Sequence, residues 1–318
     1  MLWGKDWIRL LKNEFEADEI ATALRAGSPL GIILTKEPML RHTTFEIGGP
    51  ADWMVMPADA KETAAVIRIA VDLSLPVTVI GNGSNLLVRD KGIRGLVLKI
   101  GEPMSAMRCA DEELIVGAGA LLSDVSKFAS EAGLTGLEFA VGIPGSIGGA
   151  VFMNAGAYDG EMSQVVEEVT AVCPDGAVRK HSRVQLDFGY RHSAFQDNKC
   201  IICEVKLKLS RGAREKIFEQ MQDLTRRRES KQPLEWPSAG STFRRPPGFF
   251  AGTLIEQAGC KGLCCGGAKV SEKHAGFIIN NGQASAAEVL DLIHQVQQKV
   301  KANSGVELWP EVIVLGEE

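Results

Sequence analysis

Two glycine-rich clusters are the segments whose composition points most directly to chemistry. The first is Gly81-Asn82-Gly83-Ser84-Asn85-Leu86, which follows an apolar run at 77–80 that predicts a buried strand. The second is Gly142-Ile143-Pro144-Gly145-Ser146-Ile147-Gly148-Gly149. Glycine lets the backbone approach a ligand and turn its N–H groups inward, and such a nest holds an anion, typically a diphosphate. The alternative is that these glycines only form tight turns. The first cluster lacks the third glycine of the Rossmann fingerprint and no Walker A motif is present, so a phosphate site of another kind is predicted.

Both clusters resemble the flavin-contacting loops of the FAD domain of vanillyl-alcohol oxidase-type enzymes. Together with Thr43-Thr44-Phe45-Glu46-Ile47-Gly48-Gly49 they resemble the UDP-N-acetylenolpyruvoylglucosamine reductase family. Three later segments are similar to motifs of that family: Tyr190-Arg191-His192-Ser193-Ala194-Phe195, Ser238-Ala239-Gly240-Ser241-Thr242-Phe243 and Gly305-Val306-Glu307-Leu308-Trp309-Pro310-Glu311-Val312. The motifs occur in the family's order from about residue 40 to the end, and the compact length resembles the shorter of its two subclasses.

The resemblance implies a reaction and its cofactors. The family reduces UDP-N-acetylglucosamine enolpyruvate to UDP-N-acetylmuramate for peptidoglycan synthesis, with FAD as cofactor and NADPH as co-substrate. Neither glycine cluster contains His or Cys, so non-covalent FAD is expected. The expected FAD-binding residues are Gly81, Asn82, Gly83, Ser84, Asn85, Leu86, Gly142, Ile143, Pro144, Gly145, Ser146, Gly148 and Gly149.

Three later residues match the catalytic needs of that reaction. Hydride addition to the enolpyruvyl group produces an enediolate, which needs preorganised positive charge, and C2 then needs a proton from a placed acid. Arg191 fits the first role because a guanidinium can grip a carboxylate with two N–H bonds. Ser241 fits the proton donor if water is excluded. Glu311 is expected to be protonated or to act through Arg191 or a water, because an ionised carboxylate would repel the enediolate.

Each assignment has a structural alternative. Arg191 could form a strand-end salt bridge, Ser241 could be an ordinary turn residue, and Glu311 could be an exposed carboxylate on an edge strand. Tyr190 is expected near the flavin or the substrate carboxylate, with a packed aromatic as its alternative.

Substrate contacts and departures from the family pattern concern three positions. Arg244-Arg245 stands where the family usually has Lys-Asn, so a positive charge is kept at Arg244 and an amide is missing at Arg245. Both are predicted to bind substrate. Gly276 replaces a usual asparagine, which removes another donor. No metal site is predicted, because flavin hydride transfer needs none and the five histidines form no metal motif.

Periodicity and capping signals predict the elements that carry these motifs. A helix is predicted from Asp59, with Glu62 completing a capping box, and another from near Ser123, with Gly133 as its C-cap. The last helix is predicted from Ser285, with Glu288 in its capping box. A charged helix is predicted over 213–230, with Ile217, Met221 and Leu224 on one apolar face. Strands are predicted at 77–80, 96–100, 114–116, 165–172, 201–209 and 306–315.

The predicted fold class is α+β: an FAD-binding domain of the vanillyl-alcohol oxidase/PCMH type followed by a smaller α+β substrate-binding domain. The predicted divisions are a helical segment at 1–42 that packs on the FAD domain, the FAD domain at 43–211 and the C-terminal domain at 212–318. The apolar stripe of the N-terminal helix is Trp3, Trp7, Leu10 and Leu11.

Composition restricts partners and compartment. The 318 residues are 45% hydrophobic and 24% charged, as in an ordinary globular protein, and the net charge of −5 argues against a basic nucleic-acid footprint. No apolar run approaches the roughly 18 residues of a membrane span. The seven cysteines are expected to be reduced. A cytoplasmic location is therefore expected, and the arginine run at 226–228 is expected on a solvated helix face. Small-molecule partners follow from the family resemblance, and a monomer or weak oligomer is expected.

Two other functions stay open at this point. One is another FAD-dependent oxidase or dehydrogenase built on the same domain, which should lack Ser241 and Glu311 in these contexts. The other is a non-catalytic flavin-binding module, against which the joint presence of Arg191, Ser241 and Glu311 argues.

Overall fold

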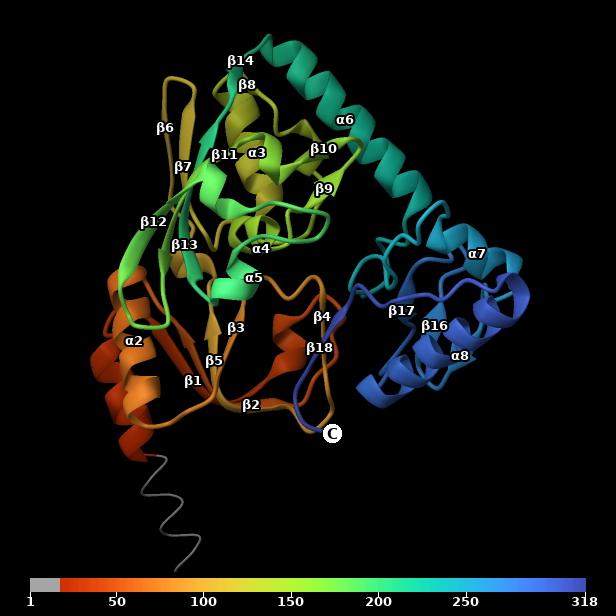
Figure 1. The fold of residues 1–318 in the computed structure, drawn as a ribbon, viewed down its shortest axis with the longest axis horizontal. Coiled ribbons are helices and arrows are strands. Elements are labelled where there is room, and N and C mark those ends of the chain that lie inside the picture. The colour runs from red at the N-terminus through yellow and green to blue at the C-terminus, as the bar shows by residue number, and fades with distance from the viewer. Residues whose placement is uncertain (1–17) are drawn as a thin grey trace, which may run out of the picture.

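The computed structural model describes residues 18–318, and the first sheet along this part of the chain has four strands (Figure 1). Its order is β1-β2-β5-β3. Strand β1 is antiparallel to β2, whereas β2 and β3 both run parallel to β5. The strands are β1 (Ile32–Pro38), β2 (Pro50–Met56), β3 (Val77–Ile80) and β5 (Ile93–Lys99).

Two predictions for this region are corrected. The segment at 1–42 is not simply helical, because a helix over 18–27 is followed by β1, whose β-branched residues pair with β2. The predicted stripe of Trp3, Trp7, Leu10 and Leu11 lies outside the described residues. Strand β3 was expected to be buried, but it is an edge strand with Val77 and Val79 exposed and only Ile80 buried.

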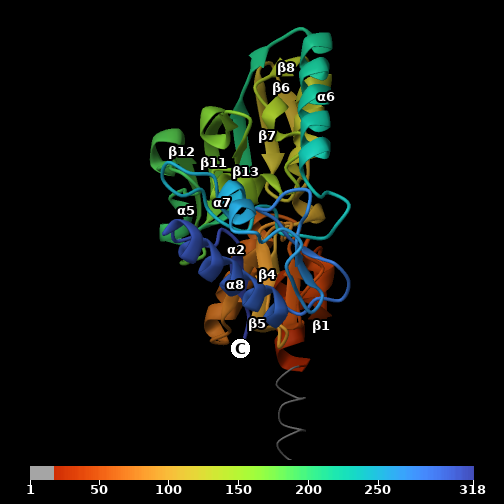
Figure 2. The ribbon, with the colours of Figure 1, turned by 90° about the vertical axis from the view of Figure 1, so that its right-hand side faces the viewer.

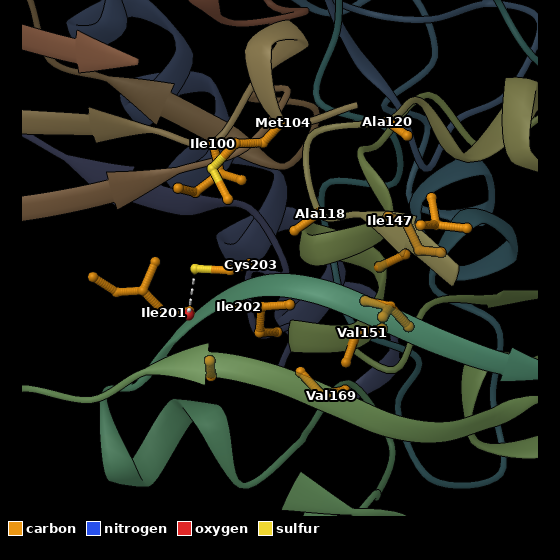
Figure 3. Packing of buried hydrophobic residues seen from close by; sticks show 14 of the residues in the cluster. Ile100, Met104, Ala118, Ala120, Ile147, Val151, Val169, Ile201, Ile202 and Cys203 are labelled. Carbon is orange, nitrogen blue, oxygen red and sulfur yellow. Dashed lines mark hydrogen bonds between the residues drawn. The ribbon is translucent and has the colours of Figure 1, made fainter. Parts of the chain in front are cut away.

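A five-stranded antiparallel sheet forms the other half of this region, in the order β12-β11-β13-β7-β6. Helix α4 packs on it, and the close view of the core places Val151 of α4 near Val169 and Ile202 on neighbouring strands (Figure 3). Burying such a side chain stabilises the fold by about 1.5–3 kcal/mol. The elements are β6 (Met107–Ala110), β7 (Glu113–Gly117), α4 (Ile147–Phe152), β11 (Val166–Val172), β12 (Val178–Ser182) and β13 (Ile201–Lys208).

The helix starts follow their capping residues. Asp59 caps α2 (Ala60–Asp72) by accepting from the backbone of Lys61 and Glu62. Glu62 does not complete the expected box, because its carboxylate accepts from Ser28 Oγ and from the N–H groups of Leu30 and Ala58. It thereby ties the N-terminal segment to α2. Helix α3 (Leu122–Glu131) ends just before Gly133, whose φ is +69°, as expected of a glycine there.

Helix α6 (Arg214–Lys231) runs from the first part of the chain toward the C-terminal part (Figures 1 and 2). The predicted apolar face is confirmed, since Ile217, Met221 and Leu224 are buried. The helix packs against α3 and against the 3-10 turn η3 (Glu138–Ala140). The domain boundary drawn at residue 211 stays a prediction, and the packing associates α6 with the first domain.

The C-terminal part packs around a second core, between α7 (Ala251–Gln257), α8 (Ala286–Ser304) and a small antiparallel sheet, and Phe45, Ile47 and Leu87 of the first part contribute to it. The sheet consists of β15 (Cys264–Cys265), β16 (Ala268–Val270) and β17 (Ile278–Asn280). The capping box of Ser285 and Glu288 at the start of α8 is confirmed. No helix among residues 18–318 is long and apolar enough to cross a membrane.

The chain returns to the first domain at its end. Strand β18 (Ile313–Leu315) pairs in parallel with β4 (Leu86–Val88), directly after the first glycine cluster. The predicted strand over 306–315 is therefore shorter than expected, because Pro310 forms only an isolated bridge to Phe243. This return brings Glu311 beside the first glycine cluster.

Short elements complete the described chain. They are β8 (Leu134–Thr135), β9 (Gly156–Ala157), β10 (Gly160–Glu161), α5 (Phe195–Asn198), β14 (Ser210–Arg211) and the 3-10 turns η1 (Met39–His42), η2 (Glu102–Met104), η4 (Met162–Gln164) and η5 (Arg183–Leu186).

One cysteine pair corrects the expectation that all seven are reduced. Cys173 and Cys200 form a disulfide across the ends of β11 and β13. The register explains the pairing, because Val172 lies opposite Ile201 in this antiparallel pair, and Cys173, just after β11, and Cys200, just before β13, are the residues next beyond it. The partners are 27 residues apart in the chain, so no local motif reveals them.

Candidate active site

The two glycine clusters lie against each other and form one site. Asn82 Nδ2 donates to the carbonyl of Pro144 at 2.5 Å. A Cβ at Gly81 would collide with Ser146 Oγ, and one at Gly145 would lie 3.3 Å from Ser84 Oγ. Segments about 60 residues apart in the chain are thus joined, as a shared ligand would require.

The first cluster presents backbone donors. The N–H groups of residues 82–85 donate no hydrogen bond to any other residue within 18–318. Gly83 has φ +69° and packs against the carbonyl of His42, which leaves no room for a side chain. Free N–H groups on a tightly turned backbone suit an anion such as a diphosphate.

Arg228 contributes a cation that the sequence reasoning missed. Its side chain lies against Gly142 of the second cluster. Its Nε is buried with no hydrogen-bond partner among the described residues, and burial lowers the pKa of Arg228. The expectation of a solvated arginine run is therefore wrong for this residue. Positions 217, 221, 224 and 228 share one face of α6, so helical spacing could have found it.

These observations show that the site fits FAD. A buried guanidinium nitrogen without a partner is costly unless an acceptor approaches it. The glycines keep side chains out of the space where the two clusters meet, and Arg228 faces the second cluster. The dinucleotide of FAD carries a diphosphate that such donors can bind.

The three predicted catalytic residues line one cavity of about 840 Å³. Arg191 Nε donates to Glu311 Oε1 at 2.6 Å, and these side chains are 25% and 13% exposed. Ser241 lines the same cavity and is exposed to it. Glu311 is thus not an exposed edge carboxylate, and Arg191 does form a salt bridge, but with a residue of the site.

The Arg191 loop is held from the end of α4. Arg191 has φ +55°, an uncommon left-handed conformation for a residue with a side chain. Gln196 Nε2 donates to the carbonyls of Arg191 at 2.9 Å and Phe152 at 3.0 Å. Asn154, which is buried, donates to the carbonyl of Gly189 at 3.0 Å. These amide side chains fix the backbone from which the guanidinium extends.

Ser241 and Glu311 are positioned by a shared network. The N–H of Glu311 donates to the carbonyl of Thr242 at 2.8 Å, and Asn85 Nδ2 donates to the carbonyl of Glu311 at 3.1 Å. Gly240, before Ser241, has φ +72°, a left-handed conformation that glycine adopts without steric cost and that gives the segment a tight turn there. Glu311 therefore links the serine segment to the first glycine cluster.

The predicted substrate residues differ in their placement. Tyr190 is 60% exposed, with the Arg191 guanidinium 5.1 Å from its ring centroid and its Oη accepting from the N–H of Arg245 at 3.4 Å. The Arg245 guanidinium lies 4.1 Å from the Phe250 ring on the cavity wall. Arg244 is exposed and is not among the residues that line the cavity.

His274 is a further cavity residue that the sequence reasoning did not assign. Its Nδ1 accepts from the N–H of Gly276 at 3.1 Å, and its ring packs on Phe277. Burial lowers the pKa of His274, and the positive charge of Lys261 acts in the same direction. A Cβ at Gly276 would lie 3.0 Å from the ring, so the asparagine usual in the family would require the ring to move.

Known proteins match both parts of the chain. Residues 51–182 match the FAD binding domain family, and residues 232–315 match the UDP-N-acetylenolpyruvoylglucosamine reductase C-terminal domain. A UDP-N-acetylenolpyruvoylglucosamine reductase of Pediococcus pentosaceus is 50% identical over 286 residues, which cover 90% of this chain and 95% of that protein. The chain belongs to the UDP-N-acetylenolpyruvoylglucosamine reductase family.

Comparisons with other members of the reductase family support the same assignment. The protein of that name from Syntrophomonas wolfei is 49% identical, covering 90% of this chain and 96% of its own. The crystal structure of the reductase from Thermus caldophilus superposes with a TM-score of 0.77 at 36% identity, over 90% of this chain and 99% of that one. The predicted α+β fold, an FAD-binding domain of the PCMH type followed by a smaller C-terminal domain, is confirmed.

Proposed function

We propose that the chain is an oxidoreductase that reduces UDP-N-acetylglucosamine enolpyruvate to UDP-N-acetylmuramate, with non-covalent FAD and with NADPH as co-substrate. The observation that carries the proposal is that Arg191, Ser241 and Glu311 line one cavity in a chain of the reductase family. The proposal includes a role in peptidoglycan synthesis, and so in cell shape and division. It also includes a cytoplasmic location and a monomer or weak oligomer.

The glycine clusters and Arg228 would hold the cofactor. FAD supplies hydride transfer when bound, while the protein supplies binding, orientation and electrostatics. The backbone N–H groups of residues 82–85 and the buried Nε of Arg228 are the donors that fit its diphosphate.

Arg191 binds the carboxylate of the enolpyruvyl group and stabilises the enediolate. Its Nε is engaged by Glu311, which leaves the two terminal nitrogens of the guanidinium for substrate. A preorganised cation opposite developing negative charge is a large contribution to catalysis. The ion pair supports the route in which Glu311 acts through Arg191, by fixing the plane of the guanidinium.

Ser241 donates the proton that C2 of the substrate requires. A serine hydroxyl is a weak acid, so the step needs a strongly basic carbon and a site without water. Ser241 is exposed to the cavity in this structure, and bound substrate must therefore provide the exclusion of water. No Gly-x-Ser-x-Gly sequence surrounds it, which argues against a covalent serine nucleophile.

The cationic side chains at the cavity mouth would bind the UDP part of the substrate. Arg245 is held on Phe250 and hydrogen-bonded through its N–H to Tyr190, so it is presented to the cavity. Arg244, which does not line the cavity, would act as a charge from its rim. The amides missing at Arg245 and Gly276 are replaced by charge at the first position only.

Stopped-flow absorbance of bound FAD with Ser241→Ala tests the proposal. Reduction by NADPH should stay within about twofold, whereas reoxidation by the enolpyruvyl substrate should slow by about 10²–10⁴ because the proton donor is lost. Ser238→Ala, in the same segment, is the matched control. Equal loss in both half-reactions would contradict the role of Ser241. Oxidation by oxygen instead of substrate would support a different oxidase, and no turnover would support a flavin-binding module.

A further inference from the structure

A cluster of two cysteines and one histidine lies at one end of the five-stranded sheet. Cys173 follows β11, Cys200 precedes β13, and His181 belongs to β12. One ring nitrogen of His181 and the two sulfurs all lie within 4.8 Å of one another. None of the residues proposed above to contact FAD or substrate belongs to this cluster.

One ring nitrogen of His181, Nε2, is buried without a hydrogen-bond partner among residues 18–318. The imidazole packs edge-on against buried Phe195, with centroids 5.3 Å apart, so the ring is held in place. A buried ring nitrogen without a partner is uncommon, because desolvation is then uncompensated. A ligand shared with the neighbouring sulfurs would remove that cost.

We propose that Cys173, Cys200 and His181 bind one Zn²⁺ ion when the two cysteines are reduced. Thiolate and imidazole are the ligands that zinc prefers, at about 2.3 Å for sulfur and 2.0–2.1 Å for nitrogen. Two sulfurs at tetrahedral positions on one zinc lie about 3.8 Å apart, so the S–S bond must open before both can bind the ion. Binding releases the two thiol protons to solvent and transfers no electron. Three protein ligands leave the fourth position to water.

The disulfide is the oxidised form of the same site. A phosphine reductant breaks the S–S bond and is itself oxidised to the phosphine oxide, with water supplying the oxygen and the two thiol protons. Oxidised cysteines cannot ligate zinc, so oxidation and zinc binding exclude each other.

The site would tie three strands together and support the loop that carries Arg191. Cys173, His181 and Cys200 come from three neighbouring strands or their ends, and His181 packs on Phe195 at the start of α5. The next residue of α5, Gln196, holds the carbonyl of Arg191. The proposed zinc therefore supports this loop and takes no part in the reaction, and its test is independent of the proposed reductase activity.

Zinc titration of the full chain tests the proposal. The FAD-loaded protein is reduced with a phosphine, freed of reductant without oxygen and titrated with Zn²⁺ against a chromophoric chelator. We expect one Zn²⁺ per chain, at least 100-fold weaker binding in Cys173→Ser and Cys200→Ser, and at least tenfold weaker binding in His181→Asn. The controls Cys264→Ser and His294→Gln, both at exposed positions, should bind like the unmodified chain.

Alkylation of the unmodified chain keeps the test decisive if a variant does not fold. Zn²⁺ should protect Cys173 and Cys200 from a maleimide, while exposed Cys109 and Cys264 stay reactive; peptide mass spectrometry reads each site. The proposal is overturned by reduced protein that binds no stoichiometric zinc, by a disulfide that survives reduction of the native protein, or by binding lost in Cys264→Ser but kept in Cys200→Ser.

Discussion

The ion pair between Arg191 and Glu311 is the contact on which the proposed chemistry depends, and a double-mutant cycle can measure it. The cycle compares Arg191→Met, Glu311→Met and the double variant with the unmodified chain, because methionine at either position removes the hydrogen bond. Residue 191 has φ +55° in the structure. Arginine and methionine are penalised alike in that conformation, so backbone strain cancels and the coupling energy reports the side chains.

The expected coupling follows from burial and geometry. A hydrogen bond to a charged group contributes about 1.5–3 kcal/mol to stability, whereas an exposed ion pair contributes about 0.2–1 kcal/mol. The Arg191 side chain is 25% exposed and that of Glu311 is 13% exposed, with 2.6 Å between Nε and Oε1. Discounting the first range for solvent screening gives a coupling of about 1–2 kcal/mol, or roughly 5–30-fold in the folded to unfolded ratio.

Urea unfolding of the FAD-loaded protein provides the measurement, with equal m-values as the condition for comparing variants. The same variants should leave flavin reduction by NADPH intact. Arg191→Met should slow the enolpyruvyl half-reaction by about 10²–10³. Glu311→Gln, measured beside the cycle, should slow it less than Glu311→Met, because an amide oxygen still accepts from Nε. A coupling below about 0.3 kcal/mol would refute the reasoning, since the two changes would then be independent.

Two further predictions concern residues that the structure adds to the site. Arg228→Met should weaken FAD binding by about 10–150-fold in a fluorescence titration, because a charge-assisted hydrogen bond is lost. The control is Arg227→Met, at an exposed neighbour that pairs with Asp223, and it should bind FAD normally. Equal losses in the two variants would assign the effect to net charge. Burial lowers the folded-state pKa of His274 below its ordinary value of 6.5, so the unfolded chain binds the proton first as the pH falls. Its contribution to stability is complete above pH 6.5 and is lost as the pH falls toward the folded pKa. His274→Gln should therefore flatten the fall in unfolding free energy between about pH 7.5 and 5.5, and an unchanged slope, or the same flattening in His294→Gln, would contradict this.

Local signals in the sequence predicted much of the fold. The cap at Asp59, the capping box of Ser285 and Glu288 and the apolar stripe of α6 depend on residues within a few positions of one another, so they can be read directly. The position of β3 at the edge of its sheet could not be predicted from the sequence, because an exposed valine on an edge strand gives the same sequence pattern as a buried one.

The residues of the candidate site also include some that local sequence signals reveal and some that they do not. The composition of the glycine clusters indicates an anion-binding site. The roles of Arg191, Ser241 and Glu311 were predicted from a family resemblance, because a single arginine, serine or glutamate in a sequence does not by itself indicate a catalytic role.

What the sequence by itself determined is the set of local elements, the glycine clusters and the family motifs. Only the tertiary structure decided that Glu311 meets Arg191, that Arg228 turns into the second cluster, and that Cys173 faces Cys200. The physical reason is that these contacts join residues 27 to 120 positions apart, and strand register and helix packing, rather than chain proximity, set such distances.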